Sequence, residues 1–218
     1  ALSEKNNVKI SLLAKKTSRS SELFKSENFL DEIIDLDSTK DGILGFFNLS
    51  KEIKKRKFDK IYIFNGSLRY KLIAIFAGIK SIYQYPLFTS KDIIFQTAKV
   101  FTEPLVGKIL STEPNLLLKE EEVREAKSTY RINEKTKNIV LGVSASGPTK
   151  RWGIENYINL ATQLSQYKEC KFFIAVGKND SEIIDKIKKS NINTICMTME
   201  KLSISNILTI IKNCNLYI

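Results

Sequence analysis

Short apolar runs alternate with helical patterns in the first half of the chain. The runs are rich in β-branched and aromatic residues, as in Lys60-Ile-Tyr-Ile-Phe64, which is typical of buried strands. Ser67 stands where a helix needs an N-cap, and Gly78 stands where that helix would close. The pattern predicts strands at 9–14, 33–36, 60–64 and 81–85, and helices at 41–57 and 68–77.

The second half repeats the alternation. After a run of apolar residues at 139–143, apolar side chains recur from Ile154 to Leu164 at the spacing of one helix face. Alternating strands and helices predict α/β layers built around a parallel sheet. Further strands are predicted at 172–176, 194–197 and 216–218, and further helices at 180–189 and 203–214.

The pattern weakens between the two halves. Glu103-Pro104 and Glu113-Pro114 are expected to break helices, and 119–127 is a run of charged residues. We therefore expect an N-terminal Rossmann-like domain, a linker and a second Rossmann-like domain. Both domains are expected to be incomplete, because 1–4 resembles the end of a helix and a strand has just begun at 216. The predicted boundaries are 1–112, 113–137 and 138–218.

Charge and composition narrow the choice of partners. The net charge is +11, from 35 basic and 24 acidic residues, which favours anionic ligands such as phosphorylated molecules, nucleic acid or an acidic membrane surface. Lysines that only solvate the surface would give the same charge, so this interpretation also stays open. The basic residues are scattered without interleaved aromatic residues, which argues against a single-strand binder, so we expect no nucleic-acid partner.

Several classes of site are disfavoured by residue content. The chain has no histidine, so neither a His base nor a His metal ligand exists within it. Its three cysteines form no CxxC pair, and we expect neither a zinc site nor disulfides but a reducing, cytoplasmic environment. No apolar run approaches the ~20 residues of a membrane span.

One turn carries more candidate chemistry than any other. Residues 144–157 read SASGPTKRWGIENY and connect a predicted strand to a predicted helix. In a parallel sheet, ligands lie beyond the carboxyl ends of strands, where a helix N-terminus favours phosphate. Neither a P-loop nor a nucleophile elbow fits, because Pro148 replaces the P-loop lysine and Ser146 replaces the second glycine of the elbow. Diphosphate binding and a plain surface loop remain.

At this turn the chain resembles glycosyltransferase family 9, the heptosyltransferases. The stretch Val143-Ser-Ala-Ser-Gly-Pro-Thr-Lys-Arg-Trp152 is similar to the family's T-K-x-W-P-x-E motif, with Gly153 in place of the usual proline. The stretch from Phe64 to Tyr85 is similar to its S-x-R-S-A segment with the A-G-I and R-I-G-Y sequences, and 175–182 is similar to its donor-nucleoside segment. The resemblance spans most of the chain.

The resemblance implies a GT-B fold, in which two Rossmann-like domains face each other across a cleft. It implies inverting transfer of heptose from ADP-heptose to the inner core of lipopolysaccharide, without a metal ion or another cofactor. A different nucleotide-sugar donor on the same fold stays open, as does a non-catalytic basic binding module. The expected partners are the nucleotide-sugar donor and the lipopolysaccharide acceptor at the membrane surface, which would make the protein cytoplasmic or peripheral at the inner membrane.

The resemblance also assigns roles to individual residues. Lys150 would contact the donor diphosphate, with hydrogen bonds from Ser144, Ser146 or Thr149. Glu182 would accept hydrogen bonds from the ribose, although a carboxylate in a first helical turn is equally explained by the helix dipole.

Three further expectations concern residues outside that donor set. Arg69 would meet an anionic acceptor, with a solvated helix Arg as the alternative. Trp152 is expected to be buried by packing, and Gly153 is expected to loosen the helix start. The family's general-base Asp and its D-[ST]-G-x-x-H motif are absent from these residues, so we expect this chain alone not to catalyse transfer.

Overall fold

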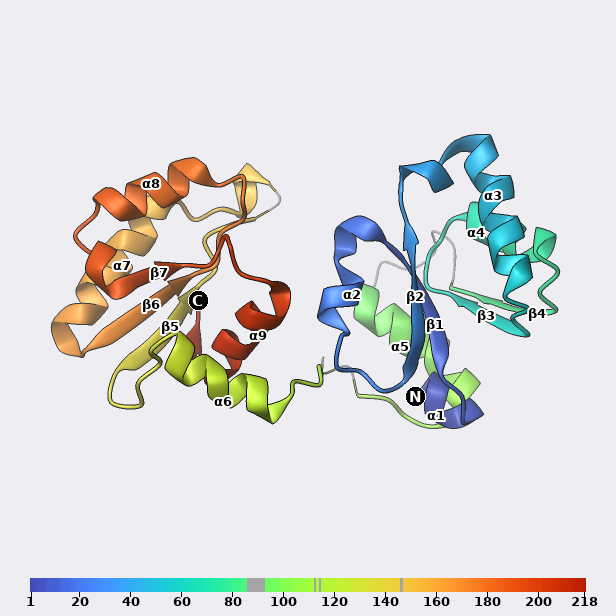
Figure 1. Cartoon of the computed structure of the whole chain (residues 1–218), viewed down its shortest axis with the longest axis horizontal. Helices are drawn as coiled ribbons and strands as arrows, with labels where there is room; N and C mark the ends of the chain where they lie inside the picture. Colours follow the sequence, from blue (N-terminus) through green and yellow to red (C-terminus); the bar gives the residue numbers. More distant parts are fainter. Residues whose placement is uncertain (86–92, 112, 114, 146) are drawn as a thin grey trace. The chain divides into compact units, whose positions relative to one another are not determined.

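The computed structural model describes residues 1–85, 93–111, 113, 115–145 and 147–218. The chain divides into two compact units, Ala1–Leu116 and Leu117–Ile218. Each unit combines parallel strands with helices, as the alternating pattern predicts. Figure 1 labels the elements of both units.

The second unit is a four-stranded parallel sheet in the order β7-β6-β5-β8. In chain order this is 3-2-1-4, the arrangement of the first half of a Rossmann fold, and it places the point where the strand order reverses between β5 and β8. Its strands are β5 (Lys137–Leu141), β6 (Cys170–Ile174), β7 (Cys196–Thr198) and β8 (Leu216–Tyr217), and its helices are α6 (Glu120–Thr129), α7 (Ile154–Tyr167), α8 (Ser181–Lys189) and α9 (Ile204–Asn213), with the 3-10 turns η3 (Pro148–Lys150) and η4 (Asn193–Ile195).

Alternate residues of β5 and β6 are buried on opposite faces of this sheet. Ile139, Leu141 and Phe172 pack under α7 and α8, whereas Val140 and Phe173 pack against α9 and the turn after α6. Figure 1 shows these helices as layers on the two faces. Strands buried on both faces read as continuous apolar runs, which is why they were predictable.

The first unit contains two parallel strand pairs, β1–β2 and β3–β4, that are not hydrogen-bonded to each other. One core joins them, because Leu13 and Leu36 from the first pair and Ile61 and Ile82 from the second pack on buried residues of α3 and α4. The elements are α1 (Leu2–Asn6), β1 (Ile10–Lys15), η1 (Lys16–Ser18), α2 (Ser20–Leu23), β2 (Leu30–Leu36), η2 (Ser38–Lys40), α3 (Gly42–Lys55), β3 (Lys60–Ile63), α4 (Leu68–Phe76), β4 (Ser81–Gln84) and α5 (Ile94–Val106).

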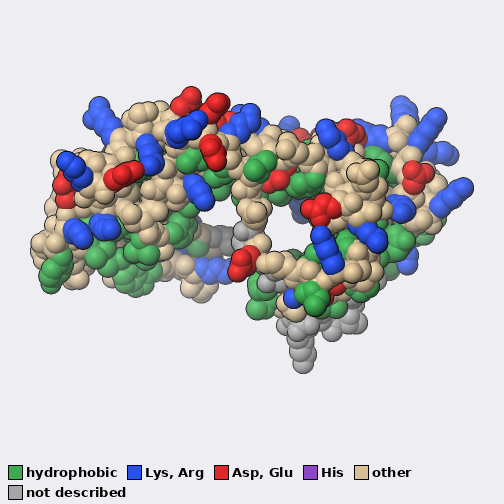
Figure 2. Space-filling view, turned by 90° about the horizontal axis from the view of Figure 1, so that it is seen from below, with side chains coloured by type: hydrophobic (Ala, Val, Ile, Leu, Met, Phe, Trp, Pro, Cys, Tyr) green, Lys and Arg blue, Asp and Glu red, His purple; other side chains and the backbone are tan. Residues whose placement is uncertain are grey.

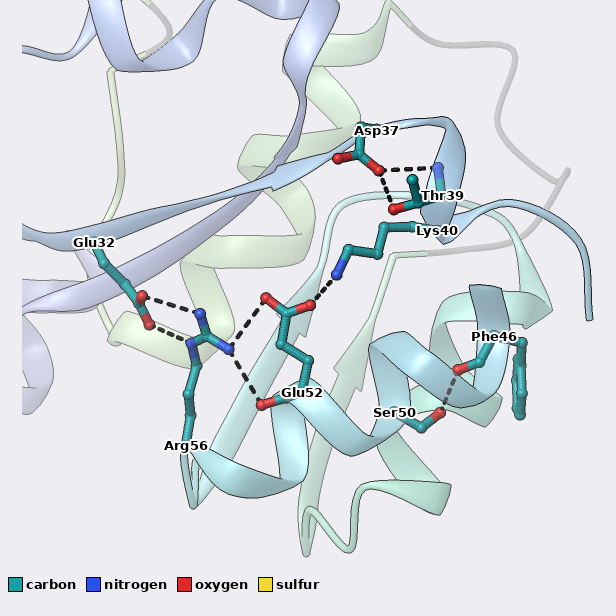
Figure 3. Close-up of polar contacts among 8 residues, drawn as sticks. All are labelled: Glu32, Asp37, Thr39, Lys40, Phe46, Ser50, Glu52 and Arg56. Atoms are coloured by element: carbon teal, nitrogen blue, oxygen red, sulfur yellow. Dashed lines mark hydrogen bonds and ion pairs between the residues drawn. The ribbon is translucent and has the colours of Figure 1, made fainter. Parts of the chain in front are cut away.

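A chain of ion pairs fixes α3 to the strand and turn that precede it (Figure 3). Arg56 Nε donates to Glu32 Oε1 of β2 at 2.7 Å, and Arg56 NH1 lies 3.3 Å from Glu52 Oε1. Lys40 of η2 donates to the other oxygen of Glu52. These contacts, mainly the hydrogen bond from Lys40, hold the pKa of the Glu52 carboxyl below its ordinary value.

The structure corrects two expectations from the sequence, the linker 113–137 and the helix break at Pro104. The predicted linker 113–137 contains helix α6, which packs on α9 and belongs to the second unit. The chain divides between residues 116 and 117. The charged run hides this helix because only a few small or apolar residues, such as the buried Ala126, face α9. Pro104 was expected to break a helix but lies inside α5, where it stands in the last turn before Gly107 closes the helix at φ 71°. Pro114 lies outside the described residues.

Candidate functional site

The loop from β5 to α7, residues 142–153, leaves the sheet at its point of reversed strand order. Gly142 makes the first bend: a Cβ there would lie 2.5 Å from the hydroxyl of Tyr217 on the neighbouring strand β8. Tyr157 of α7 donates from its hydroxyl to the Gly142 carbonyl at 3.1 Å. The start of the loop is therefore bonded to Tyr157 and lies close against Tyr217, whose ring would have to shift to admit a larger residue at 142.

Asp180, at the start of α8, links this loop to the loop after β6. Its Oδ2 accepts from the Gly177 backbone N–H at 2.8 Å and also from the Ser144 hydroxyl. Its Oδ1 lies 3.6 Å from Arg151 NH2. The hydrogen bond from Ser144, then that from Gly177 and the charge of Arg151, hold the Asp180 pKa below its ordinary value. Asp180 therefore stays ionised and joins the two loops.

Ser144 and Arg151 are both committed to this internal network. The Ser144 hydroxyl donates its one hydrogen bond to Asp180, so it is not free to donate to a phosphate in this arrangement. Arg151 donates from Nε and NH2 to the Ala145 carbonyl, both at 3.1 Å, in addition to its ion pair. These hydrogen bonds and the ion pair hold the backbone of the loop in one conformation.

Thr149 and Lys150 differ from these two residues. Both lie on the 3-10 turn η3, both are exposed, and neither side chain bonds any residue that the structure describes. The Lys150 backbone N–H donates to the Gly147 carbonyl at 3.1 Å, which fixes the turn while its ammonium group remains free. The predicted contact at Ser146 lies outside the described residues. Among the described residues of the loop, Thr149 thus offers a hydroxyl and Lys150 a cation without an acidic partner.

The residues that follow η3 differ from expectation. Trp152 was expected to be buried, but it is 54% exposed, and its ring meets the Tyr157 ring edge to face with centroids 5.1 Å apart. The next residue, Gly153, adopts φ 93°, a conformation that the family's usual proline cannot take. The Asn156 side-chain amide then donates to the Trp152 carbonyl at 2.6 Å. An exposed indole beside Lys150 is available to a ligand.

Glu182 lies in the first turn of α8 and is largely exposed. Its carboxylate is 3.7 Å from Lys186 Nζ, which also lies 3.4 Å from Glu155 of α7. Its surroundings suit either assigned role, a ribose acceptor or a carboxylate favoured by the helix dipole. The ribose contact stays a prediction.

Arg69 lies in the first unit, in the opening turn of α4. Its NH2 donates to the carbonyls of Lys40 and Gly42, both at 2.8 Å, and its guanidinium lies 5.7 Å from the centre of the Phe46 ring. Arg69 therefore joins the starts of α3 and α4. Its contact with an acceptor stays a prediction, and these bonds give it a structural role in the unit.

Other site classes find no support among the described residues. In those residues no three His, Cys, Asp or Glu side chains are grouped as a metal ion would need. Cys170, Cys196 and Cys214 are free thiols, and burial raises the pKa of Cys196 to about 12. No helix in the described part of the chain is long and apolar enough to cross a membrane.

The comparisons agree on one family. The model of glycosyltransferase family 9 (heptosyltransferase) matches residues 83–218. The structure resembles Escherichia coli ADP-heptose LPS heptosyltransferase II with a TM-score of 0.77 at 17% identity, covering 99% of this chain and 71% of that one. No curated protein matches the chain.

Two further structures share the fold. The family 9 glycosyltransferase from Veillonella parvula has a TM-score of 0.75 at 15% identity, covering 96% of this chain and 65% of that one. E. coli heptosyltransferase WaaC with ADP has a TM-score of 0.65 at 8% identity, covering 96% and 71%. The chain is thus shorter than these proteins and shares the GT-B-like fold of heptosyltransferases. With its family model matching well over half of its residues, the chain belongs to glycosyltransferase family 9.

Proposed function

We propose that the second unit binds the diphosphate of a nucleotide-sugar donor at the loop between β5 and α7. The observation that carries this proposal is the ammonium group of Lys150, which has no acidic partner among the described residues and lies on the turn η3 at the reversal of the strand order. A metal-independent transferase has to neutralise the departing diphosphate with protein groups, and Lys150 supplies a full positive charge. Thr149 adds a hydroxyl donor beside it.

The donor that we propose is ADP-heptose, and the acceptor is the inner core of lipopolysaccharide. Membership of the family supports a heptosyltransferase-like glycosyltransferase. The names of the structural neighbours, which include ADP-heptose and ADP, support the adenine nucleotide. In this proposal Glu182 accepts hydrogen bonds from the ribose hydroxyls, and the indole of Trp152 covers one side of the donor. Arg69 contacts the anionic acceptor with the donors left after its two backbone bonds.

A nucleotide titration tests the phosphate assignment. The whole chain is titrated with ADP, GDP and UDP, using the fluorescence of Trp152, the single tryptophan, or calorimetry. Lys150→Ala should weaken ADP binding by about tenfold or more, because a charge-assisted contact to phosphate is lost. Lys168→Ala is the matched control, since it removes the same charge from an exposed residue just before β6, at the opposite end of the strands.

The outcomes separate four interpretations. Equal loss with both variants would mean a general charge effect, and unchanged binding by Lys150→Ala would show that the phosphate assignment is wrong. Tighter binding of GDP or UDP than ADP would keep the diphosphate site but assign another donor. A larger affinity for ADP-heptose than for ADP would extend the site to the sugar.

A further inference from the structure

We propose that α3 and α4 of the first unit form a docking surface for an anionic phospholipid bilayer. The surface centres on Phe47 and Phe76, which are both exposed although their ring centroids lie only 6.2 Å apart, edge to face. The proposal concerns a different unit from the donor loop and does not depend on nucleotide binding.

Two rows of exposed apolar side chains meet at this pair of rings. On α3, Ile43 and Leu44 precede Phe47 by one turn and are 78% and 80% exposed. On α4, Leu68 and Leu72 precede Phe76 at intervals of four residues, so they lie on the same helix face. We call these side chains, together with Ile75, the apolar patch. Single exposed apolar residues are ordinary, but seven on two helices that meet at the Phe47–Phe76 contact favour an interaction site.

The apolar patch is held in a fixed shape. Arg69 bonds the carbonyls of Lys40 and Gly42, which ties the start of α4 to the start of α3. Gly45 approaches the backbone of Lys40 so closely that a Cβ there would lie 2.2 Å from its carbonyl carbon. The ion pairs of Figure 3 fix the rest of α3. A preformed surface loses little entropy on binding.

Uncompensated lysines border the apolar patch. Lys51 and Lys54 continue the exposed row of α3 beyond Phe47, and Lys71 lies between Leu68 and Ile75 on α4. None of these three pairs with an acidic residue in the described part of the chain. Figure 2 shows several Lys and Arg side chains at the right-hand end of the view, in the first unit.

The charge around the patch selects the occupant. Residues 42–80 contain nine Lys or Arg and two acidic residues, a net charge of +7 out of +11 for the chain. Two copies of this surface would repel each other, which disfavours a homodimer through it. Protein interfaces are depleted in Lys and enriched in Tyr, Trp and Arg, whereas large aliphatic and Phe side chains bordered by Lys suit the boundary of an anionic bilayer.

Vesicle co-sedimentation of the whole chain tests the proposal. We expect binding to vesicles of about three parts phosphatidylcholine to one part phosphatidylglycerol and little binding to phosphatidylcholine alone. The double variant Leu44→Ser, Leu72→Ser should lower the partition coefficient by about tenfold or more. Its control is Ile109→Ser with Tyr167→Ser, two residues that are each 88% exposed outside the patch and should change little.

The charge contribution has its own pair of variants. Lys51→Gln with Lys54→Gln should lower the partition coefficient by about tenfold, whereas Lys188→Gln with Lys189→Gln, exposed on α8, should have a much smaller effect. Equal effects of the two lysine pairs would mean non-specific attraction and would overturn the proposal. Absence of vesicle binding would overturn it too. In that case, self-association through the patch would indicate a homodimer surface, and capture of an acidic protein would indicate a protein partner. ADP binding, measured in parallel, should be unchanged in all four variants.

Discussion

The two units bury their apolar residues to very different degrees. Among the ten largest side chains that are fully buried in the described residues, eight lie in the second unit and only Leu49 and Ile73 lie in the first. The exposed large apolar side chains show the reverse, with sixteen in the first unit and six in the second. A continuous sheet covered on both faces gives the second unit its core, whereas the first unit divides four strands into two pairs.

The same division appears in the comparisons. The family model matches 83–218, which includes the whole second unit, while the structural likeness to heptosyltransferase II covers 99% of the chain. The fold is therefore shared by both units, whereas the family model matches the whole second unit and only the last part of the first. The second unit therefore has the more fully buried core, whereas the first unit exposes more of its large apolar side chains.

The largest expected effect is a difference in stability between variants of the two cores. Phe173→Ala empties a fully buried site in β6 and should lower the free energy of unfolding by about 3–5 kcal/mol. Phe76→Ala removes a ring that is 58% exposed and should cost about 1 kcal/mol or less. Urea unfolding followed by far-UV circular dichroism, which reports on the helices of both units, measures the two losses, and Trp152 fluorescence reports on the second unit alone. Equal losses for the two variants would contradict the contrast between the cores.

The second prediction concerns the carboxylate that joins the loops of the second unit. Asp180→Ala leaves the Gly177 N–H and the Ser144 hydroxyl without their acceptor and should lower the free energy of unfolding by about 1–3 kcal/mol. Asp185→Ala, on the exposed side of the same helix, is the control and should stay within about 0.5 kcal/mol of wild type.

The pH dependence sharpens this test. Because folding lowers the Asp180 pKa, its contribution is complete above the ordinary aspartate pKa and is lost as the pH falls through the lowered value. The difference in stability between wild type and Asp180→Ala should therefore shrink on acidification. A difference that persists to the lowest pH at which the chain folds would show that the charge of Asp180 is not what stabilises the loops.

Local pattern was sufficient for the elements of the fold. Continuous apolar runs predicted β5 and β6, and Ser67 caps α4 as expected, accepting from the Arg69 N–H at 3.3 Å. The loop between β5 and α7 also lies where the sequence placed it, because small residues and cations between a strand and a helix are a local signal. Helix α6 was missed because its sequence is mostly charged, with Ala126 as its buried residue, and because it packs on α9, which is distant in sequence.

Contacts between distant segments account for the rest of the site. Asp180 lies 36 residues from Ser144, and nothing in the sequence pairs them. The turn residues Gly177-Lys-Asn-Asp180 before a helix signal an N-cap, which could have singled out Asp180, but its carboxylate is turned back toward the loop. The exposure of Trp152 likewise depends on how the loop lies on the folded unit, which composition does not reveal.

The smallest expected effect lies in the polar network of the first unit. Glu52→Gln removes the charge that Lys40 and Arg56 share, and all three side chains are partly exposed, so the loss should be about 1 kcal/mol and should shrink at high salt. The lowered pKa of Glu52 means that this contribution is present above the ordinary glutamate pKa and is lost as the pH falls through the lowered value.

Hydrogen exchange of the α3 amides measures this loss of stability locally, because α3 opens with the first unit. Glu121→Gln, on the exposed side of α6, is the matched control. Faster exchange in α3 with unchanged exchange in β5 and β6 would show that the two units open separately, whereas equal acceleration in both would mean that they unfold as one.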